Sequence, residues 1–550
     1  MHIGGQFYAD EDVRILAPSP ISHETCHSVP VELTVQEIKG IIDDFIKAAH
    51  RAKLGGIDGI ELKCDQGFLI YQFLSPLYNR RSDKFGGSHK KRLRFLLDII
   101  KGVRAVVGSD FVIGVRITGD AMTPGDLTLT NAIKISRDLE ATGLIDYIHV
   151  NGATNSTFRG YLASHGDSSV ARMNFVPLAK EIKAAVNLPV IAASMISHPS
   201  EAEHVVSSGF ADMVAMTRAH IAEAEIVNKI RDGKIEDIRP CVLSNQGCVG
   251  NHWKGLDVRC IHNPATGRER ELGIGTITKA EDQKEIAVVG GGIAGMEVAR
   301  VAAMRGHKVT LFERQKLLGG QILLASKFPY RQGLLDIAHY LELQIKKLKI
   351  DIYCGVEVKS EDILSTEEDF DAIVIATGAD FFSPPLYEKR APASVLSIRD
   401  VLEEKVQLGN NILVVDSDWR HNPLAVVEWL IQRDRKVTVI SSAYFVGKGL
   451  DVVTLASYYS RIQKAAKFLP LTDLVSLKNK TAYLRNVLTN ELEEIYPIDQ
   501  VVFVSSMKPV ADLYFNLKNK LHNVFRVGDC IHPLSIPNVM LEANRLARTL

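Results

Sequence analysis

The chain has 550 residues, of which 46% are apolar and 24% charged, and its 65 basic and 65 acidic side chains give a formal net charge of zero. This balance excludes the strongly basic footprint of a nucleic-acid-binding protein and gives no sign of an acidic substrate. No apolar run approaches the roughly 20 residues of a membrane span, and the first residues lack the pattern of a signal peptide. We therefore expect a globular, cytoplasmic protein of about three or four domains, whose seven cysteines do not form disulfides.

Residues 1–235 alternate short apolar runs with stretches of helical periodicity. The apolar runs cover residues 56–63, 111–117, 145–150, 189–194 and 211–217. Repeated strand–helix units of this length predict an α/β fold with a parallel sheet, which could close into a barrel or stay open with helices on both faces. The pattern alone leaves both architectures open.

Three further segments are expected after this first domain. Residues 236–283 are richer in Cys, Asn and Gly and are typical of a connecting module. A nucleotide-binding domain is predicted at residues 284–380 and 500–550. Residues 381–499 interrupt it with a strand–helix–strand unit of their own.

The clearest chemical signal lies at residues 284–313. An apolar strand leads into Gly290-Gly291-Gly292-Ile293-Ala294-Gly295, and a helix and a second strand that ends in Glu313 follow. The glycines allow a tight turn, close approach of the backbone to a pyrophosphate and close packing of helix on strand, and the acid can accept from a ribose hydroxyl. A glycine-rich turn alone is weak evidence, but the complete order predicts a dinucleotide site.

The residues that follow the first apolar run resemble the fourth-strand signature of the Old Yellow Enzyme family of flavin-dependent (β/α)8 barrels. The resemblance rests on Gln72-Phe73-Leu74-Ser75-Pro76, Asn79, Arg80-Arg81, Asp83 and Gly86-Gly87-Ser88. The resemblance extends over essentially the whole chain. The multidomain arrangement is similar to that of the family branch that contains trimethylamine dehydrogenase, 2,4-dienoyl-CoA reductase and the N-methylproline and dimethylglycine demethylases.

The resemblance implies a TIM barrel followed by an FAD/NAD(P)-binding Rossmann-like domain, with an inserted second nucleotide-binding-like domain. Counted backwards from the eighth barrel strand, residues 56–63 are the fourth strand, and residues 1–5 resemble the end of the third. We therefore expect an N-terminally truncated barrel that lacks its first strands and has open sheet edges.

The resemblance also implies FMN in the barrel. Arg116 ends the fifth strand at the carboxyl-end face, where barrel sites are built, and is placed beside the flavin pyrimidine ring; a salt-bridged strand-end arginine is the alternative. Relatives usually carry His or Tyr, and then His, at the positions of Lys63 and Gln66. Lys63 could donate a proton if it is desolvated, and a solvated strand-end lysine is the alternative.

Two further sets of residues are implied as cofactor contacts. The loops after strands seven and eight, where such barrels hold a phosphate, supply Ala193, Ser194, Met195, Thr217 and Arg218. The second domain is expected to bind FAD or ADP through Gly290, Gly292, Ala294, Gly295, Glu313, Arg314, Gly320, Gln321, Thr377, Gly378 and Asp529.

The family's iron–sulfur motif, Cys-x2-Cys-x3-Cys-x11-Cys, falls on Cys241, Ser244, Cys248 and Cys260. Four thiolates normally hold a four-iron cluster. Because Ser244 stands in the second place of the motif, the resemblance implies only three metal ligands, which are Cys241, Cys248 and Cys260. A [4Fe-4S] cluster with another fourth ligand, a [3Fe-4S] cluster and a lost cluster all stay open. The other four cysteines are scattered and are expected to be plain core or surface residues.

The inserted domain lacks a glycine fingerprint, because its turn reads Asp416-Ser417-Asp418-Trp419. These side chains would obstruct a pyrophosphate and the two carboxylates would repel it. NAD(P)H is not expected to bind there, which favours the amine dehydrogenase and demethylase members over the dienoyl reductase.

The leading interpretation is a flavin-dependent oxidoreductase that oxidises an N-methylated amine or amino acid by hydride transfer to FMN. Electrons would pass through an iron–sulfur centre to an external acceptor such as an electron-transfer protein. An NAD(P)H-dependent enoate or 2,4-dienoyl reductase is one alternative, and a truncated, catalytically degenerate flavoprotein homologue is another. A homo-oligomer is expected, without nucleic-acid or membrane partners.

Overall fold

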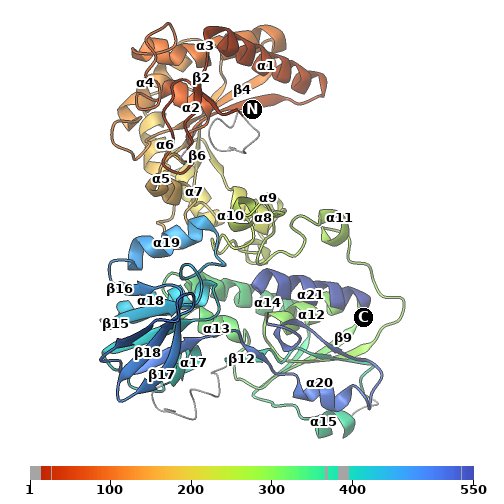
Figure 1. The fold of residues 1–550 in the computed structure, drawn as a ribbon. Helices are drawn as coiled ribbons and strands as arrows, with labels where there is room; N and C mark the ends of the chain where they lie inside the picture. Colours follow the sequence, from red (N-terminus) through yellow and green to blue (C-terminus); the bar gives the residue numbers. More distant parts are fainter. Residues whose placement is uncertain (1–13, 27, 366–368, 382–394, 534) are drawn as a thin grey trace. The chain divides into compact units, whose positions relative to one another are not determined.

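The computed structural model describes residues 14–26, 28–365, 369–381, 395–533 and 535–550. The chain divides into two compact units, which are residues 1–166 with 170–217 and residues 167–169 with 218–550 (Figure 1). The division at residue 217 falls inside the segment that the sequence assigned to the barrel. Residues 1–5, compared above with the end of a barrel strand, lie outside the described residues.

The first unit is built on a five-stranded parallel sheet with the order β3-β4-β5-β6-β7. Its strands are β3 (Gly59–Cys64), β4 (Val112–Thr118), β5 (Tyr147–Asn151), β6 (Val190–Ala193) and β7 (Met213–Ala215). Each predicted apolar run overlaps one of them. The strands follow one another in chain order, as in a (β/α) barrel, whereas an open doubly wound sheet reverses its order at a switch point. The barrel alternative is therefore the correct one.

Helices and two short strands complete the first unit. They are β1 (Leu16–Ala17), β2 (Val31–Glu32), α1 (Val35–Leu54), α2 (Leu69–Leu74), α3 (His89–Val107), α4 (Leu129–Glu140), α5 (Phe158–Ser164), α6 (Val176–Lys183) and α7 (Pro199–Ser207). The start of α1 illustrates why they form: Thr34 and Glu37 cap each other's backbone N–H groups, and the helix then buries Ile38 and Phe45 on one face. Among the described strands, β3 and β7 each pair on one side alone.

The second unit contains a parallel sheet with the order β10-β9-β8-β11-β22. Its strands are β8 (Glu285–Val289), β9 (Lys308–Glu313), β10 (Asp351–Cys354), β11 (Ala372–Ile375) and β22 (Val524–Arg526). The helix α12 (Ile293–Met304) packs on α14 (Leu335–Lys347) and on α21 (Ile536–Thr549), and the three share one apolar core with this sheet (Figure 1). This is the predicted Rossmann-like arrangement, with the glycine-rich turn between β8 and α12.

A second parallel sheet, with the order β13-β20-β14-β15-β16, lies in the same unit. It consists of β13 (Val395–Ser397), β14 (Asn411–Asp416), β15 (Lys436–Ser441), β16 (Ala466–Leu469) and β20 (Gln500–Val504). One apolar core joins this sheet to α18 (His421–Ile431) and α19 (Val452–Ile462), and another joins it to an antiparallel sheet of β17 (Thr472–Lys478), β18 (Thr481–Asn486) and β19 (Leu492–Ile495).

The sequence boundary at residue 500 assigned β20 to the first nucleotide fold, but the strand pairs with β13 and β14 in the second sheet. All five residues of β20 are buried, so its apolar pattern is equally compatible with the centre of either sheet. The pattern could not decide between the two.

Shorter elements connect these sheets. They are α8 (Thr217–Ala222), α9 (Ile226–Arg231), η2 (Ile235–Asp237), α10 (Val249–Trp253), α11 (Glu269–Leu272), α13 (Gln321–Ala325), η3 (Gln332–Leu334), α15 (Ser360–Ser365), β12 (Ala379–Asp380), α17 (Ile398–Leu402), β21 (Lys508–Pro509), α20 (Asp512–Leu517) and η5 (Gly528–Cys530). In the described part of the chain, no helix combines the length and the apolar character that a membrane crossing needs.

Candidate functional site

A charged cluster lies at the carboxyl ends of β3 and β4 in the first unit. Lys63 and Arg116 are register partners on these strands, and Asp65 follows β3 directly. The Lys63 Nζ lies 2.7 Å from Asp65 Oδ1 and donates to Gln66 Oε1 at 3.0 Å, while Arg116 Nε lies 3.2 Å from Asp65 Oδ2. Asn151, at the end of β5, also donates to Asp65 Oδ2. The predicted catalytic residues Lys63, Gln66 and Arg116 are thus brought together.

Asp65 holds this cluster in place, and its side chain is fully buried. Burial alone would raise the pKa of Asp65, but the charges of Lys63 and Arg116 and the hydrogen bonds from Lys63 and Asn151 hold it below its usual range. The carboxylate is therefore ionised at neutral pH. Lys63, Asp65 and Arg116 thus contribute two positive charges and one negative charge, and the carboxylate of Glu61 on β3 lies close enough to Arg116 to be affected by it.

The surroundings of Lys63 and Arg116 bear on the two interpretations given for each residue. The Lys63 side chain is 20% exposed, and its Nζ lies 4.4 Å from the centre of the Phe68 ring. Lys63 is therefore partly shielded from solvent, and its role as a proton donor stays a prediction. Arg116 is salt-bridged, as its alternative interpretation expected, yet the geometry of Nε leaves that nitrogen without a hydrogen bond. Its contact with a flavin stays a prediction.

Three more polar residues beside this cluster were not found from the sequence. On β3, Glu61 Oε2 lies 2.8 Å from Nδ1 of His149 and accepts from the Tyr147 hydroxyl at 3.3 Å. Burial would raise the pKa of Glu61, but the contact with His149 lowers it overall. A signal was present, because Glu61, Lys63 and Asp65 alternate, which places their side chains on one face of β3.

The loops at the carboxyl ends of the barrel strands contain unusual backbone conformations. Gln66, Ala153, Ser194 and Met195 have φ values of 55°, 59°, 89° and 55°. Residues other than glycine seldom adopt this region, at a cost of about 1–3 kcal/mol each, and such residues cluster at binding sites. The carboxyl-end face of the sheet therefore carries both the charge cluster and the strained loops.

The predicted FMN-phosphate residues fall in different units. Ala193 and Met195 are buried, and Ser194 Oγ donates to Asn174 Oδ1 at 2.7 Å. Thr217 is the last residue of the first unit, while Arg218 belongs to the second, where its Nη1 donates to Asn245 Oδ1 at 2.8 Å. A phosphate contact of these five residues stays a prediction.

The glycine-rich turn of the second unit has the features that a pyrophosphate requires. Gly290 has a φ of 116°, and a Cβ at Gly290 or Gly295 would overlap a backbone carbonyl. Gly292, the N-cap of α12, has instead no atom within 4 Å of the position that a Cβ would take. The N-terminus of the helix therefore faces open space, with N–H groups free to bind an anion.

Other predicted nucleotide residues gather around this turn. Gly319 N donates to Gly291 O at 2.9 Å, and a Cβ at Gly320 would lie 3.1 Å from the Cα of Gly292. The Gln321 Nε2 donates to Asp529 Oδ2 at 3.4 Å and to the carbonyl of Ala379. Gly378 (φ of 75°) lies near Gln321 Nε2, Ala294 lies against Gly528, and Thr377 Oγ1 donates to the carbonyl of Val510.

Glu313 closes the site from the end of β9. Its two carboxylate oxygens accept from Gly291 N at 2.6 Å and from Gln315 N at 2.7 Å. A carboxylate has about four acceptor positions, so it can still accept from a ribose hydroxyl. The neighbouring Arg314 is exposed. The residues present thus fit an adenine dinucleotide such as FAD.

The corresponding turn of the second sheet is filled by the protein itself. The buried carboxylate of Asp416 accepts from the N–H groups of Trp419 at 2.8 Å and Gly447 at 3.1 Å. Burial raises the pKa of Asp416, and it raises that of Asp418 to about 6. The arrangement supports the prediction that no pyrophosphate binds at residues 416–419.

The three cysteines of the iron–sulfur motif lie in one module of the second unit. Burial is the main cause that raises the pKa of Cys248, and the charge of Cys241 raises it further. Burial likewise raises the pKa of Cys260, with a smaller contribution from the charge of Cys248. Among the described residues, however, no three His, Cys, Asp or Glu side chains are placed so that they could hold a metal ion. As placed, the thiols do not fit a cluster, which stays a prediction. Of the other cysteines, Cys64 and Cys530 are buried and Cys354 is exposed, as expected.

Comparison with known proteins connects these sites to two families. Residues 2–237 match the NADH:flavin oxidoreductase / NADH oxidase family, and residues 284–494 match the pyridine nucleotide-disulphide oxidoreductases. The chain is 34% identical to the N,N-dimethylglycine/sarcosine dehydrogenase of Chromohalobacter salexigens, over 97% of this chain and 82% of that protein. It is 34% identical to a probable N-methylproline demethylase of Rhizobium meliloti, over 92% of this chain and 74% of that protein.

A solved structure extends the likeness to the fold of the whole chain. A 2-naphthoyl-CoA reductase in complex with 2-naphthoyl-CoA is matched with a TM-score of 0.90 and 27% identity, over 100% of this chain and 82% of that one. The resemblance seen in the sequence is thereby confirmed. The chain belongs to the NADH:flavin oxidoreductase / NADH oxidase family and is an FMN-dependent oxidoreductase with a second, FAD/NAD-binding domain.

Proposed function

We propose that this oxidoreductase oxidises an N-methylated amino acid. Two relatives with this type of substrate in their names support the proposal. The observation that carries it is the cluster at the carboxyl ends of β3 and β4, in which Lys63 and Arg116 supply two cations around Asp65. An N-methylated amino acid brings a carboxylate that such a cluster attracts, whereas a simple amine does not.

The residues of the cluster would divide the work. FMN, when bound, would supply the acceptor for a hydride from the carbon next to the substrate nitrogen. Arg116 would stabilise the negative charge that the reduced flavin acquires. Lys63, held by Asp65, would bind the substrate carboxylate, and Gln66 would keep the ammonium group oriented through its 3.0 Å contact.

The glycine-rich turn of the second domain would hold FAD or ADP, and we propose an electron-transfer protein as the acceptor. The homo-oligomer and the cytoplasmic location predicted from the sequence remain predictions. The substrate is a small molecule.

A second candidate is the reduction of an enoyl substrate. It is favoured by the likeness to 2-naphthoyl-CoA reductase and by the ammonium group of Lys63, which could protonate a substrate carbon or oxygen. The carboxylate-filled turn at residues 416–419 argues against NAD(P)H binding in the inserted fold, so hydride would have to reach the FMN from a nicotinamide bound elsewhere.

Anaerobic stopped-flow bleaching of the FMN distinguishes these reactions. We expect N,N-dimethylglycine or sarcosine to reduce the flavin faster than NADPH does. Rapid reduction by NADPH, with none by any N-methylated compound, would contradict the proposed demethylase function and favour the reductase function. If neither donor bleaches bound FMN, the chain is the catalytically degenerate homologue.

The role of Lys63 is tested with a pair of donors. Lys63→Met should weaken the apparent binding of dimethylglycine about tenfold or more, since a charge-assisted contact is lost. Reduction by dimethylamine, which has no carboxylate, should change much less. Lys90→Met, which removes an exposed lysine of the same unit, is the matched control. Equal losses for both donors would contradict the proposed contact with the carboxylate.

A further inference from the structure

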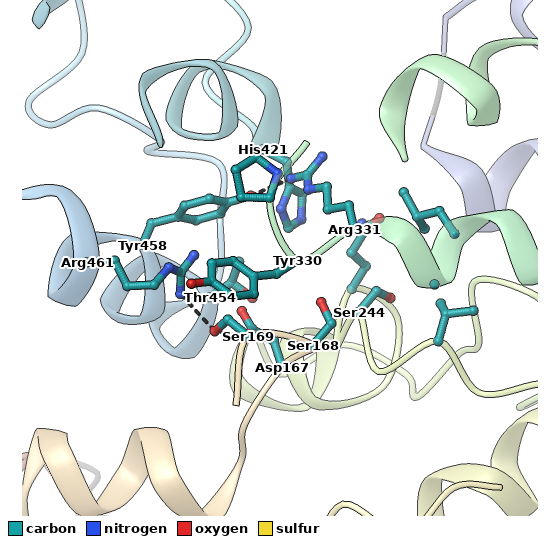
Figure 2. Close-up of a pocket in the computed structure, with 15 residues that line it drawn as sticks. Asp167, Ser168, Ser169, Ser244, Tyr330, Arg331, His421, Thr454, Tyr458 and Arg461 are labelled. Atoms are coloured by element: carbon teal, nitrogen blue, oxygen red, sulfur yellow. Dashed lines mark hydrogen bonds between the residues drawn. The ribbon is translucent and has the colours of Figure 1, made fainter. Parts of the chain in front are cut away.

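A small cavity lies in the second unit, away from the glycine-rich turn of α12. Figure 2 shows that Arg331, His421, Thr454, Tyr458 and Arg461 line it together with Ser244 of the iron–sulfur motif. Its volume is about 40 Å³. One water needs roughly 10–15 Å³ of such space, so the cavity can hold a group of several atoms but not a dinucleotide.

Arg331 supplies the cavity with a cation. Its Nη2 donates to the Tyr458 hydroxyl at 2.5 Å, and in the described parts of the chain no carboxylate forms an ion pair with it. Arg331 acts on one acid at longer range, since its charge lowers the pKa of Asp418, which burial raises overall to about 6. The guanidinium therefore has donors left for a ligand.

Arg461 differs from Arg331, because its donors are already used. Its Nη2 donates to Glu428 Oε2 at 3.0 Å, and its Nη1 donates to Ser457 Oγ at 2.7 Å and to Ser169 Oγ at 2.8 Å, the contact drawn in Figure 2. Asp167, which also lines the cavity, accepts from the N–H and the hydroxyl of Ser169. These residues form a fixed wall beside the free donors of Arg331.

Thr454 gives the second, independent observation. It is 1% exposed, and its Oγ1 has no hydrogen-bond partner, while its backbone N–H is capped by Asp451. Buried hydroxyl groups are nearly always paired, and leaving one unpaired costs free energy. The Tyr458 hydroxyl lies on the same cavity and retains its proton at neutral pH, since burial raises its pKa.

We propose that this cavity binds a small oxoanion, held by the guanidinium of Arg331 and the hydroxyl groups of Thr454 and Tyr458. Arginine and hydroxyl donors match the acceptor oxygens of a phosphate or a carboxylate group, and both ligands share this chemistry. The positive charge of Arg331 disfavours a metal cation in this cavity. The site does not depend on the proposed amine oxidation.

The test uses the full chain with FMN and FAD bound, so that their own phosphate sites are filled. Calorimetric titration with inorganic phosphate, at constant ionic strength set with sodium chloride, should give saturable binding. Acetate is titrated in parallel, and the tighter of the two identifies the ligand as a phosphate or a carboxylate. If neither anion binds, the proposal is overturned.

Two variants locate the binding. Arg331→Met should weaken phosphate binding at least about tenfold, and Arg270→Met, which removes an exposed arginine of the same unit, should not change it. Thr454→Val keeps the shape of the side chain and removes only a hydroxyl without a partner. It should fold normally, with an unchanged or higher unfolding midpoint in chloride, yet bind phosphate several-fold more weakly. Binding that is equal in Thr454→Val and the parent protein would place the anion elsewhere.

Discussion

Lys63 and Arg116, register partners on adjacent strands, share a single buried carboxylate. Asp65 Oδ1 lies 2.7 Å from Lys63 Nζ, and Oδ2 lies 3.2 Å from Arg116 Nε. Two like charges on neighbouring strands would repel each other, and the shared carboxylate offsets this repulsion. Asp65 therefore determines where both cations of the site point.

The first prediction concerns Asp65→Asn. The variant removes the buried carboxylate that Lys63 and Arg116 share, and we expect the first unit to lose about 3 kcal/mol of unfolding free energy. Denaturant unfolding followed by circular dichroism measures this loss. Asp110→Asn, at an exposed aspartate of the same unit, should cost less than about 0.5 kcal/mol.

The coupling is then read from a double-mutant cycle. In the Lys63→Met background Asp65 has one cation fewer to balance, so Asp65→Asn should cost clearly less than in the parent protein. Strictly additive losses would mean that Asp65 and Lys63 do not interact in solution.

The second prediction uses the different surroundings of the glycines in the nucleotide turn. A Cβ at Gly292 meets nothing within 4 Å, and its φ of −71° suits any residue. Gly292→Val should therefore fold with a nearly unchanged stability in the absence of cofactor, yet lose bound FAD or ADP because the side chain fills the space of the phosphates. Cofactor released on denaturation is measured by chromatography.

Gly40→Val is the matched control, because a Cβ at Gly40 also meets nothing within 4 Å and the residue lies far along the chain, in α1. This variant should keep its full complement of nucleotide. A Gly292→Val protein that retains FAD in the same amount would refute the assignment of the turn.

Sequence reasoning succeeded where a local pattern fixes the answer. The glycine order at residues 290–295 and the five apolar runs of the first unit required no knowledge of distant residues. The role of Asp65 could not be predicted in this way, because its partner Arg116 lies on the next strand. The contact of Lys63 with Phe68 could not be predicted either, since it depends on how the loop after β3 folds. The position of β20 was wrong for a similar reason, because strand pairing joins residues far apart in the chain.

The third prediction concerns the iron–sulfur motif. Anaerobic, iron-replete protein should contain iron and acid-labile sulfide if a cluster forms, and Cys248→Ala should remove both. Ser244→Cys should raise the occupancy, because it restores the fourth thiolate of the motif. Cys354→Ala, at an exposed cysteine outside the motif, should leave the iron content unchanged.

Metal-free protein from the same preparation would mean that the motif has lost its metal. That result would agree with the placement of the three thiols, which form no metal site in the described structure. Iron in Ser244→Cys but not in the parent protein would show that one missing thiolate is the whole cause.

The last prediction concerns the pH dependence of stability. The pKa of Asp418 is raised to about 6 in the folded protein, chiefly by burial, from about 3.8 in an unfolded chain. The folded state therefore binds more protons than the unfolded state between these values, so the contribution of Asp418 to stability falls as the pH rises from about 4 to 6. Asp418→Asn removes this dependence and should stabilise the protein by at most about 3 kcal/mol at pH 7.5, with a gain that shrinks towards pH 4.

Unfolding midpoints of the parent protein and the variant, recorded from pH 4.5 to 8, measure the difference. Asp434→Asn, at an exposed aspartate of the same fold, should give a curve parallel to that of the parent protein. A constant gain for Asp418→Asn at every pH would mean that the carboxylate is ionised in the folded protein throughout this range.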